Sequence, residues 1–247
     1  MINLMDLSYD KLKEYIVSFN QPGFRAGQMF QWIASGVYSF DEMTDIPKTF
    51  REELKGKAYT GMLEIENKLV SEIDGTVKYL YKLSDGNAVE SVVMEYKHGT
   101  SICISTQVGC KMKCGFCASG EAGFIRNLTP GEMLGQIITA NRNLGKRISN
   151  VVLMGIGEPL DNYGNVIEFI KIANDPRGLN IGIRHFSLST SGIVPRIYDL
   201  MKEGLGLTLS VSLHSADNKK RSGLMPVNST YSIDKLIEAC KIYTEET

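Results

Sequence analysis

The spacing of hydrophobic residues divides the chain into stretches of different period. Over residues 1–60 apolar positions such as Leu12, Ile16 and Phe19 recur at helical spacing, which predicts a small N-terminal helical domain. Residues 61–96 change to short alternating runs joined by the turn-forming segments IDG and SDGN, a pattern that predicts an antiparallel β meander or linker. The first part of the chain is therefore expected to hold two accessory units.

The remaining stretch, residues 97–247, alternates apolar runs with helical patterns. The runs SICIST, NVVLMG, RHFSLST and LTLSVSL are each followed by a helical pattern, and these patterns lie near 129–145, 162–174, 193–203 and 232–245. Four successive βα units predict an α/β fold with a parallel sheet or a β/α barrel. Active sites of such barrels form at the carboxyl ends of the strands, where this chain carries GIGEP, STSG and SLHSA.

Composition is that of an ordinary globular protein, with 247 residues of which 43% are hydrophobic and 22% charged. The N-terminus does not resemble a signal peptide, and no apolar run reaches the roughly 18 residues of a membrane span. We therefore expect a cytoplasmic protein with no membrane contact. In a reducing compartment, clustered cysteines are more typical of metal ligands or catalysts than of a disulfide framework.

Charge is unevenly distributed along the chain. The formal net charge is −1, which argues against a protein that holds nucleic acid by bulk positive charge. Residues 60–96 carry three Lys and seven Asp or Glu, whereas residues 97–150 carry seven Lys or Arg and two Glu. Two interpretations stay open for the basic stretch, a solvated face or an anion that approaches the cysteines within it.

Three cysteines, Cys110, Cys114 and Cys117, form a C-x3-C-x2-C run. A structural zinc site needs four protein ligands, and neither His98 nor Cys103 completes one with zinc-finger spacing. An iron–sulfur cubane held by three thiolates instead of the usual four keeps one iron open to another ligand. The spacing favours a 4Fe-4S cluster, with zinc and unligated buried thiols as alternatives.

The cysteine run, with Phe116 before its last cysteine, resembles that of the radical S-adenosylmethionine (SAM) superfamily, in which SAM chelates the open iron. GIGEP, residues 155–159, resembles the superfamily motif that holds the amino group of SAM. Together with STSGIVPRI and SLHSADNKKRSGLMPVN, these segments make the chain similar to the RlmN/Cfr family of RNA methyltransferases. The resemblance runs from about residue 8 to the last residue.

The resemblance implies a role for particular residues. It makes a 4Fe-4S cluster and SAM the cofactors, Glu90 a proton acceptor and Cys103 a catalytic thiol. By themselves, the residues favour an exposed strand carboxylate for Glu90, a buried strand thiol for Cys103 and a core histidine for His214. The implied cluster ligands are Cys110, Cys114 and Cys117, and the implied SAM contacts are Gly157, Glu158, Ser189, Ser212, Leu213 and His214.

The implied reaction uses two SAM molecules, because an aromatic ring carbon is too weak a nucleophile for ordinary methyl transfer. SAM first methylates a cysteine. A radical formed from a second SAM takes hydrogen from that methyl group, which then adds to adenine. Glu90 removes the ring proton, and Cys103 resolves the protein–RNA link by forming a disulfide. The RlmN branch modifies C2 of adenosine in 23S rRNA and tRNA, and the Cfr branch, the alternative, modifies C8 of the same rRNA adenosine.

Partners and chain length follow from the same resemblance. It implies RNA substrates, an electron donor such as flavodoxin or ferredoxin, and a monomer. The resemblance implies a partial (β/α) barrel of the radical SAM type, with four of its six βα units present in this chain. It also implies a methyl-carrying cysteine after the barrel, a position that Cys240 does not match. We therefore expect an N-terminal portion of a longer protein, inactive alone. A zinc-containing RNA-binding module and a radical SAM enzyme acting on a small molecule are the competing interpretations.

Overall fold

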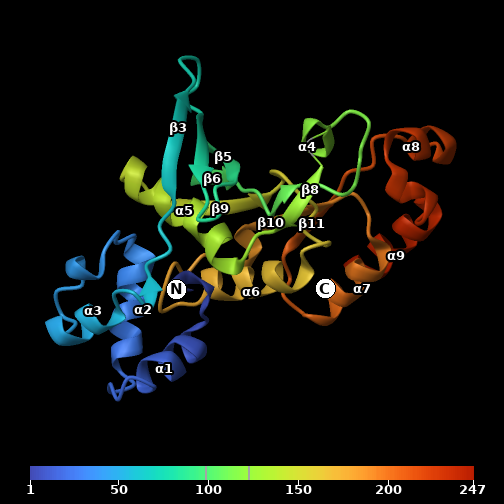
Figure 1. Cartoon of the computed structure of the whole chain (residues 1–247). Coiled ribbons are helices and arrows are strands. Elements are labelled where there is room, and N and C mark those ends of the chain that lie inside the picture. Colours follow the sequence, from blue (N-terminus) through green and yellow to red (C-terminus); the bar gives the residue numbers. More distant parts are fainter. Residues whose placement is uncertain (98, 122) are drawn as a thin grey trace.

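The computed structural model describes residues 1–97, 99–121 and 123–247, and its centre is a seven-stranded sheet (Figure 1). The strand order is β11-β10-β9-β6-β5-β4-β3, in which β6, β9, β10 and β11 are parallel and β3 to β6 antiparallel. The predicted α/β fold with four parallel strands is confirmed. The strands are β3 (Glu64–Val70), β4 (Val77–Lys82), β5 (Ala88–Tyr96), β6 (Gly99–Cys103), β9 (Ile148–Leu153), β10 (Phe186–Thr190) and β11 (Thr208–Val211).

The meander forms no sheet of its own, because β5 pairs with β6 and continues the barrel sheet. Four helices follow the parallel strands, and each lies within one residue of its predicted bounds. A fifth, α8 (Asn218–Leu224), was not predicted. The four are α5 (Pro130–Leu144), α6 (Tyr163–Asn174), α7 (Val194–Lys202) and α9 (Ile233–Glu246).

The N-terminal stretch is helical, as predicted, and docks on the start of α5. The Asp6 carboxylate accepts the Gly131 N–H at 2.7 Å, and a Cβ at Gly131 would lie 2.6 Å from Asn3 Nδ2. Glycine is therefore needed where the two parts meet. The elements here are β1 (Ile2–Asn3), a 3-10 turn (Leu4–Asp6), α1 (Tyr9–Val17), α2 (Arg25–Ser35), a 3-10 turn (Phe40–Glu42), α3 (Lys48–Leu54) and β2 (Ala58–Tyr59).

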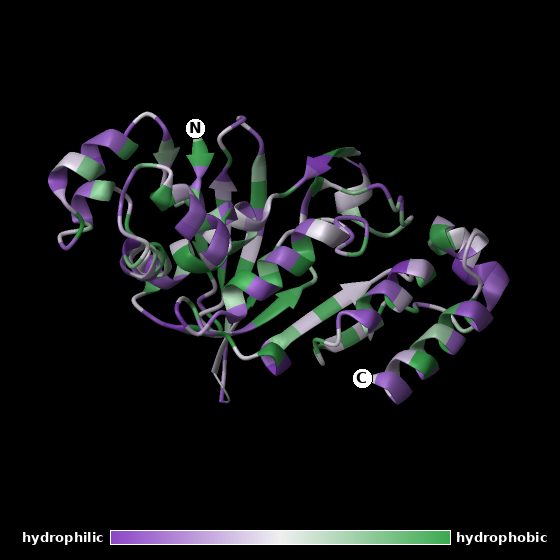
Figure 2. Cartoon of the chain, turned by 90° about the horizontal axis from the view of Figure 1, so that it is seen from below, coloured by the Kyte–Doolittle hydropathy of each residue, from purple (hydrophilic) through white to green (hydrophobic). Residues whose placement is uncertain are grey.

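The two faces of the central sheet differ in polarity. One is apolar and covered by helices: Tyr81 of β4 donates a hydrogen bond to the Gln136 carbonyl of α5 at 3.1 Å, and Phe169 of α6 meets Phe186 of β10 edge-on. Hydrophobic residues accordingly gather on the central strands and the helices beside them (Figure 2). The opposite surface, called the polar face below, carries Lys78, Glu90, Ser101, Cys103, Asn150, Ser187, Ser189 and Ser210, which strand register places on one side.

Arg126 ties the segment after the cysteine run to α5 and to the β4–β5 turn. It donates two hydrogen bonds to Glu132, at 2.7 and 2.8 Å, and one to Asp85 at 2.5 Å. The guanidinium holds the pKa of Asp85 well below its usual range. Arg126 lies in β8 (Phe124–Asn127), which pairs with β7 (Gln107–Gly109).

Replacing Arg126 by methionine is expected to lower the free energy of unfolding by about 1–3 kcal/mol. The Glu132 side chain is only 11% exposed and would lose its cationic partner. Urea denaturation measures the change. The lowered pKa of Asp85 means that its carboxylate stabilises the fold at pH values above the pKa of the unfolded state, and that this stabilisation is lost as the pH falls. The variant lacks this contribution, so its stability should fall less steeply with decreasing pH. Lys11→Met, which breaks the exposed Lys11–Glu168 pair, should change stability by less than about 0.5 kcal/mol. Equal losses in both variants would contradict this interpretation.

Candidate cofactor site

The three clustered cysteines lie on a loop that leaves the barrel after β6. The chain passes through β7, the cysteines and α4 (Ala118–Glu121), and returns through β8. Gly109 has φ +73°, and a Cβ there would lie 1.7 Å from the Gly123 carbonyl oxygen, so only glycine fits. The Cys110 N–H donates to the same carbonyl at 3.1 Å, and the Cys117 N–H donates to the Cys114 carbonyl at 3.1 Å. These bonds fold the loop into a compact turn.

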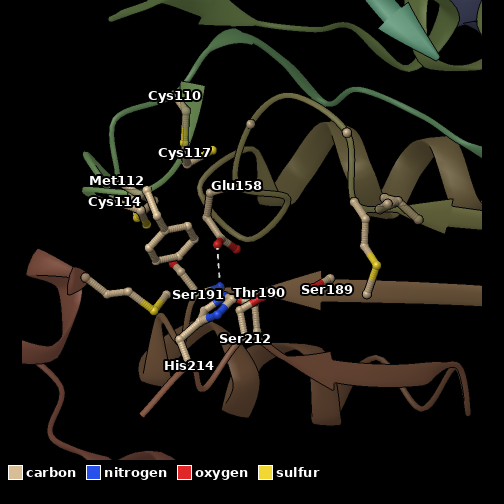
Figure 3. Close-up of a pocket in the computed structure, with 16 residues that line it drawn as sticks. Cys110, Met112, Cys114, Cys117, Glu158, Ser189, Thr190, Ser191, Ser212 and His214 are labelled. Atoms are coloured by element: carbon tan, nitrogen blue, oxygen red, sulfur yellow. Dashed lines mark hydrogen bonds between the residues drawn. The ribbon is translucent and has the colours of Figure 1, made fainter. Parts of the chain in front are cut away.

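This loop forms one wall of a cavity of about 280 Å³, and the carboxyl ends of β9, β10 and β11 form the other (Figure 3). The polar segments at the strand ends and the three cysteines therefore line one space. The lining consists of Cys110, Met112, Cys114, Phe116, Cys117, Leu153, Met154, Gly155, Gly157, Glu158, Ser189, Thr190, Ser191, Ser212, His214 and Met225.

Glu158 is the buried acid of the cavity, only 3% exposed. Its carboxylate accepts the Ser191 N–H at 2.7 Å, drawn as a dashed line in Figure 3, and the Leu160 N–H at 3.1 Å. Burial raises the pKa of Glu158, and the two N–H donors oppose that rise. The carboxylate therefore joins the GIGEP loop to the end of β10 and presents a concentrated negative charge to the cavity.

The strand-end wall that Glu158 joins also carries the other predicted SAM contacts. Ser189, Ser212 and His214 line the cavity, and the His214 ring lies 4.4 Å from the Phe116 ring of the cysteine loop. Leu213 is absent from the described lining, and its carbonyl instead accepts a hydrogen bond from Arg221 at 3.1 Å. The structure thus gathers Gly157, Glu158, Ser189, Ser212 and His214 around one space and leaves the Leu213 side chain out.

Cys103 and Glu90 lie outside the described lining of this cavity but on the polar face. Cys103 pairs in register with Val92, two residues after Glu90, so all three side chains share that face. Burial raises the pKa of the Cys103 thiol, and a bond from the Met154 N–H opposes the rise. Glu90 pairs with Lys78 at 2.8 Å. Cys103 adjoins the cavity through Met154, which lines it, whereas Glu90 stands two strands from β9.

The cysteine loop fits an iron–sulfur cluster better than a single ion. Burial raises the pKa of Cys110 and Cys114, and each neighbouring thiolate raises it further, so the thiolate forms that bind iron need a cationic partner. Within residues 1–97, 99–121 and 123–247, no three His, Cys, Asp or Glu are placed to share one ion. His98 lies outside the described residues. A cubane needs no shared ion, because each thiolate binds a different iron.

Known proteins match the whole chain. Residues 104–247 match the model of the radical SAM superfamily, and residues 2–60 match the ribosomal RNA large subunit methyltransferase N-terminal domain. A probable dual-specificity RNA methyltransferase RlmN from Clostridium acetobutylicum is 51% identical over all of this chain and 72% of its own length. The chain belongs to the RlmN family of the radical SAM superfamily. An RlmN of Thermoanaerobacter sp. is 48% identical over all of this chain and 72% of its own.

A solved structure has the same fold as this chain. The crystal structure of a radical SAM methyltransferase from Sphaerobacter thermophilus superposes with a TM-score of 0.96 at 38% identity, over all of this chain and 74% of that one. Membership of the RlmN family implies a 4Fe-4S cluster and SAM as cofactors. The predicted disulfide finds no support, since all five cysteines are free. No helix in the described part of the chain is long and apolar enough to cross a membrane.

Several residues of the site were not predicted from the sequence. Thr190, Ser191 and Met225 line the cavity, and the buried Arg221 lies behind it. Thr190 and Ser191 belong to the STSG segment, whose position after a strand was the available signal. Met225 and Arg221 come from the segment after β11, where no pattern in the sequence marks them as close to the cysteines.

Proposed function

We propose that this chain is the cofactor-binding portion of a radical SAM RNA methyltransferase that methylates C2 of adenosine in 23S rRNA and tRNA. The observation that carries the proposal is the single cavity in which the three-thiol loop faces Glu158 and the strand-end serines. RNA as the substrate is supported by the names of the relatives, which describe dual-specificity RNA methyltransferases. C2 as the modified position rests on the likeness to RlmN.

Each wall of the cavity has a distinct task in this proposal. Cys110, Cys114 and Cys117 hold the cluster, which when bound supplies the electron that cleaves SAM to a 5′-deoxyadenosyl radical. The Glu158 carboxylate accepts a hydrogen bond from the ammonium group of SAM. Both groups are charged, and the burial of Glu158 strengthens this hydrogen bond. The hydroxyls of Ser189 and Ser212 and the His214 ring orient the ribose or the carboxylate of SAM from the ends of β10 and β11.

The polar face next to the cavity is the proposed binding site of the adenine. Glu90 accepts the ring proton there, and its ion pair with Lys78 keeps its carboxylate directed along the sheet. Cys103, whose pKa is raised by burial, is the proposed catalytic thiol of this face. Both residues remain within the same face, so one bound nucleotide can approach both.

A methylation assay on the full product of the gene tests the proposal. The protein, reconstituted anaerobically with iron and sulfide and reduced through flavodoxin, is incubated with SAM and either 23S rRNA or tRNA. Mass spectrometry of the digested RNA is expected to show 2-methyladenosine. Detection of 8-methyladenosine instead would assign the Cfr chemistry. Formation of 5′-deoxyadenosine without methylated RNA would indicate another substrate, and its absence would overturn the radical SAM assignment.

A further inference from the structure

Arg221, in α8, is a fully buried cation whose partners are all neutral. Its side chain is 0% exposed. Nη1 donates to the Asn228 Oδ1 atom at 2.8 Å, Nη2 donates to the carbonyls of Ser191 at 2.6 Å and Ser212 at 3.3 Å, and Nε donates to the Leu213 carbonyl. Within the described part of the chain, no carboxylate lies within ion-pair distance of it. Burying a charge without a counter-charge lowers the free energy of unfolding, so a buried and unpaired arginine is expected to have a specific role.

Arg221 lies next to the cofactor cavity. Two of the carbonyls it holds belong to Ser191 and Ser212, which line the cavity, so the guanidinium lies directly behind the cavity wall. The end of α8 is bonded to the cysteine loop, because the Gly115 N–H donates to the Leu224 carbonyl at 2.9 Å.

Other cations near the loop are less able to act on a cluster. Lys111 is engaged with Asp161 at 2.9 Å, and its ammonium also lies over the Phe124 ring. Lys219 and Lys220, which precede Arg221, are exposed, so water and salt screen their charge. Arg221 alone among these combines burial, a fixed geometry and contact with the wall of the cluster site.

We propose that Arg221 is a positioning residue of the cofactor site, whose buried positive charge stabilises the reduced state of the cluster. The proposal rests on the cluster assignment made above. Reduction adds one electron, taken from a low-potential one-electron donor such as dithionite or reduced flavodoxin, and no bond need form or break. The added negative charge is attracted to the buried guanidinium, so Arg221 raises the reduction potential. Glu158, a buried carboxylate that accepts the Ser191 N–H, acts in the opposite direction.

The test is a potentiometric titration of the reconstituted protein, followed by the electron resonance of the reduced cluster. Arg221→Met is expected to lower the ratio of reduced to oxidised cluster at a fixed potential about tenfold, which equals about 59 mV for one electron. Arg221→Lys, which keeps the charge, should lower it less than threefold. Lys220→Met, which removes a neighbouring exposed charge, should leave it unchanged.

A second variant changes the charge beside Arg221 and keeps the guanidinium. Asn228→Asp sets a carboxylate 2.8 Å from Nη1 and removes the hydrogen bonds that Asn228 Nδ2 donates to Asn218 and Ser222, and it should shift the ratio in the same direction as Arg221→Met. Iron content and circular dichroism show which variants are folded and loaded. If loaded Arg221→Met or Asn228→Asp protein titrates within twofold of the unaltered protein, the proposal is wrong. Failure of the unaltered protein to assemble a cluster would instead refute the proposed function.

Discussion

Replacing Cys114 by alanine is expected to abolish cluster assembly. After anaerobic reconstitution, bound iron and sulfide should fall to background and the brown visible absorbance should be lost. The reason is the number of ligands: the loop supplies three thiolates, each needed for a separate iron, and no other Cys lines the cavity in the part of the chain that the structure describes. Removal of one thiolate also removes a negative charge that the cationic irons require.

Two matched variants show that the loss is specific to the loop. Cys240→Ala alters a half-buried thiol of α9, and Cys103→Ala alters the thiol on the polar face, and neither residue lines the described cavity. Both proteins should bind as much iron and sulfide as the unaltered chain. If Cys114→Ala retains the cluster, or if any of the proteins is colourless and holds stoichiometric zinc, the open-cluster assignment fails.

The fold was predictable where the hydrophobic pattern is repetitive. The four parallel strands are short apolar runs and the helices after them have clear helical spacing, so their order and bounds followed from the sequence alone. The pairing of β5 with β6 was not predicted, since hairpin signals fix local partners but not how two sheets join. The short helix α8 was missed because its sequence, NKKRSGL, is mostly polar and has no apolar stripe.

Some residues of the site were likewise predictable from the sequence and others were not. The cysteine spacing is local, and the rule that strand ends converge placed Glu158, Ser189 and His214 beside it. Glu90 and Cys103 were identified only through the family resemblance. Burial of Arg221 could not be predicted, because an arginine in a polar segment is normally exposed.

The buried carboxylate of Glu158 gives the other large effect that we expect. Glu158→Gln should raise the dissociation constant of SAM about 10- to 100-fold, since a hydrogen bond to a charged group contributes about 1.5–3 kcal/mol. The neutral amide cannot balance the ammonium charge. The carboxylate now accepts hydrogen bonds from the N–H groups of Ser191 and Leu160, and the NH2 group of the amide would face one of these two donors. Equilibrium dialysis of SAM against the reconstituted protein measures the change.

The pH dependence separates a charge effect from a loss of folding. In the unaltered protein the carboxylate form of Glu158 binds the ammonium group of SAM. The affinity for SAM should therefore fall as the pH drops through the raised pKa of Glu158. In the Glu158→Gln variant the affinity should no longer depend on pH in this way. Glu132→Gln is the matched control, because Glu132 is also a buried carboxylate but is bonded to Arg126 away from the cavity. That variant should lose stability and keep its SAM affinity. Equal weakening of SAM binding in both variants would mean that Glu158 acts only through the fold, because a carboxylate outside the cavity cannot contact the ligand.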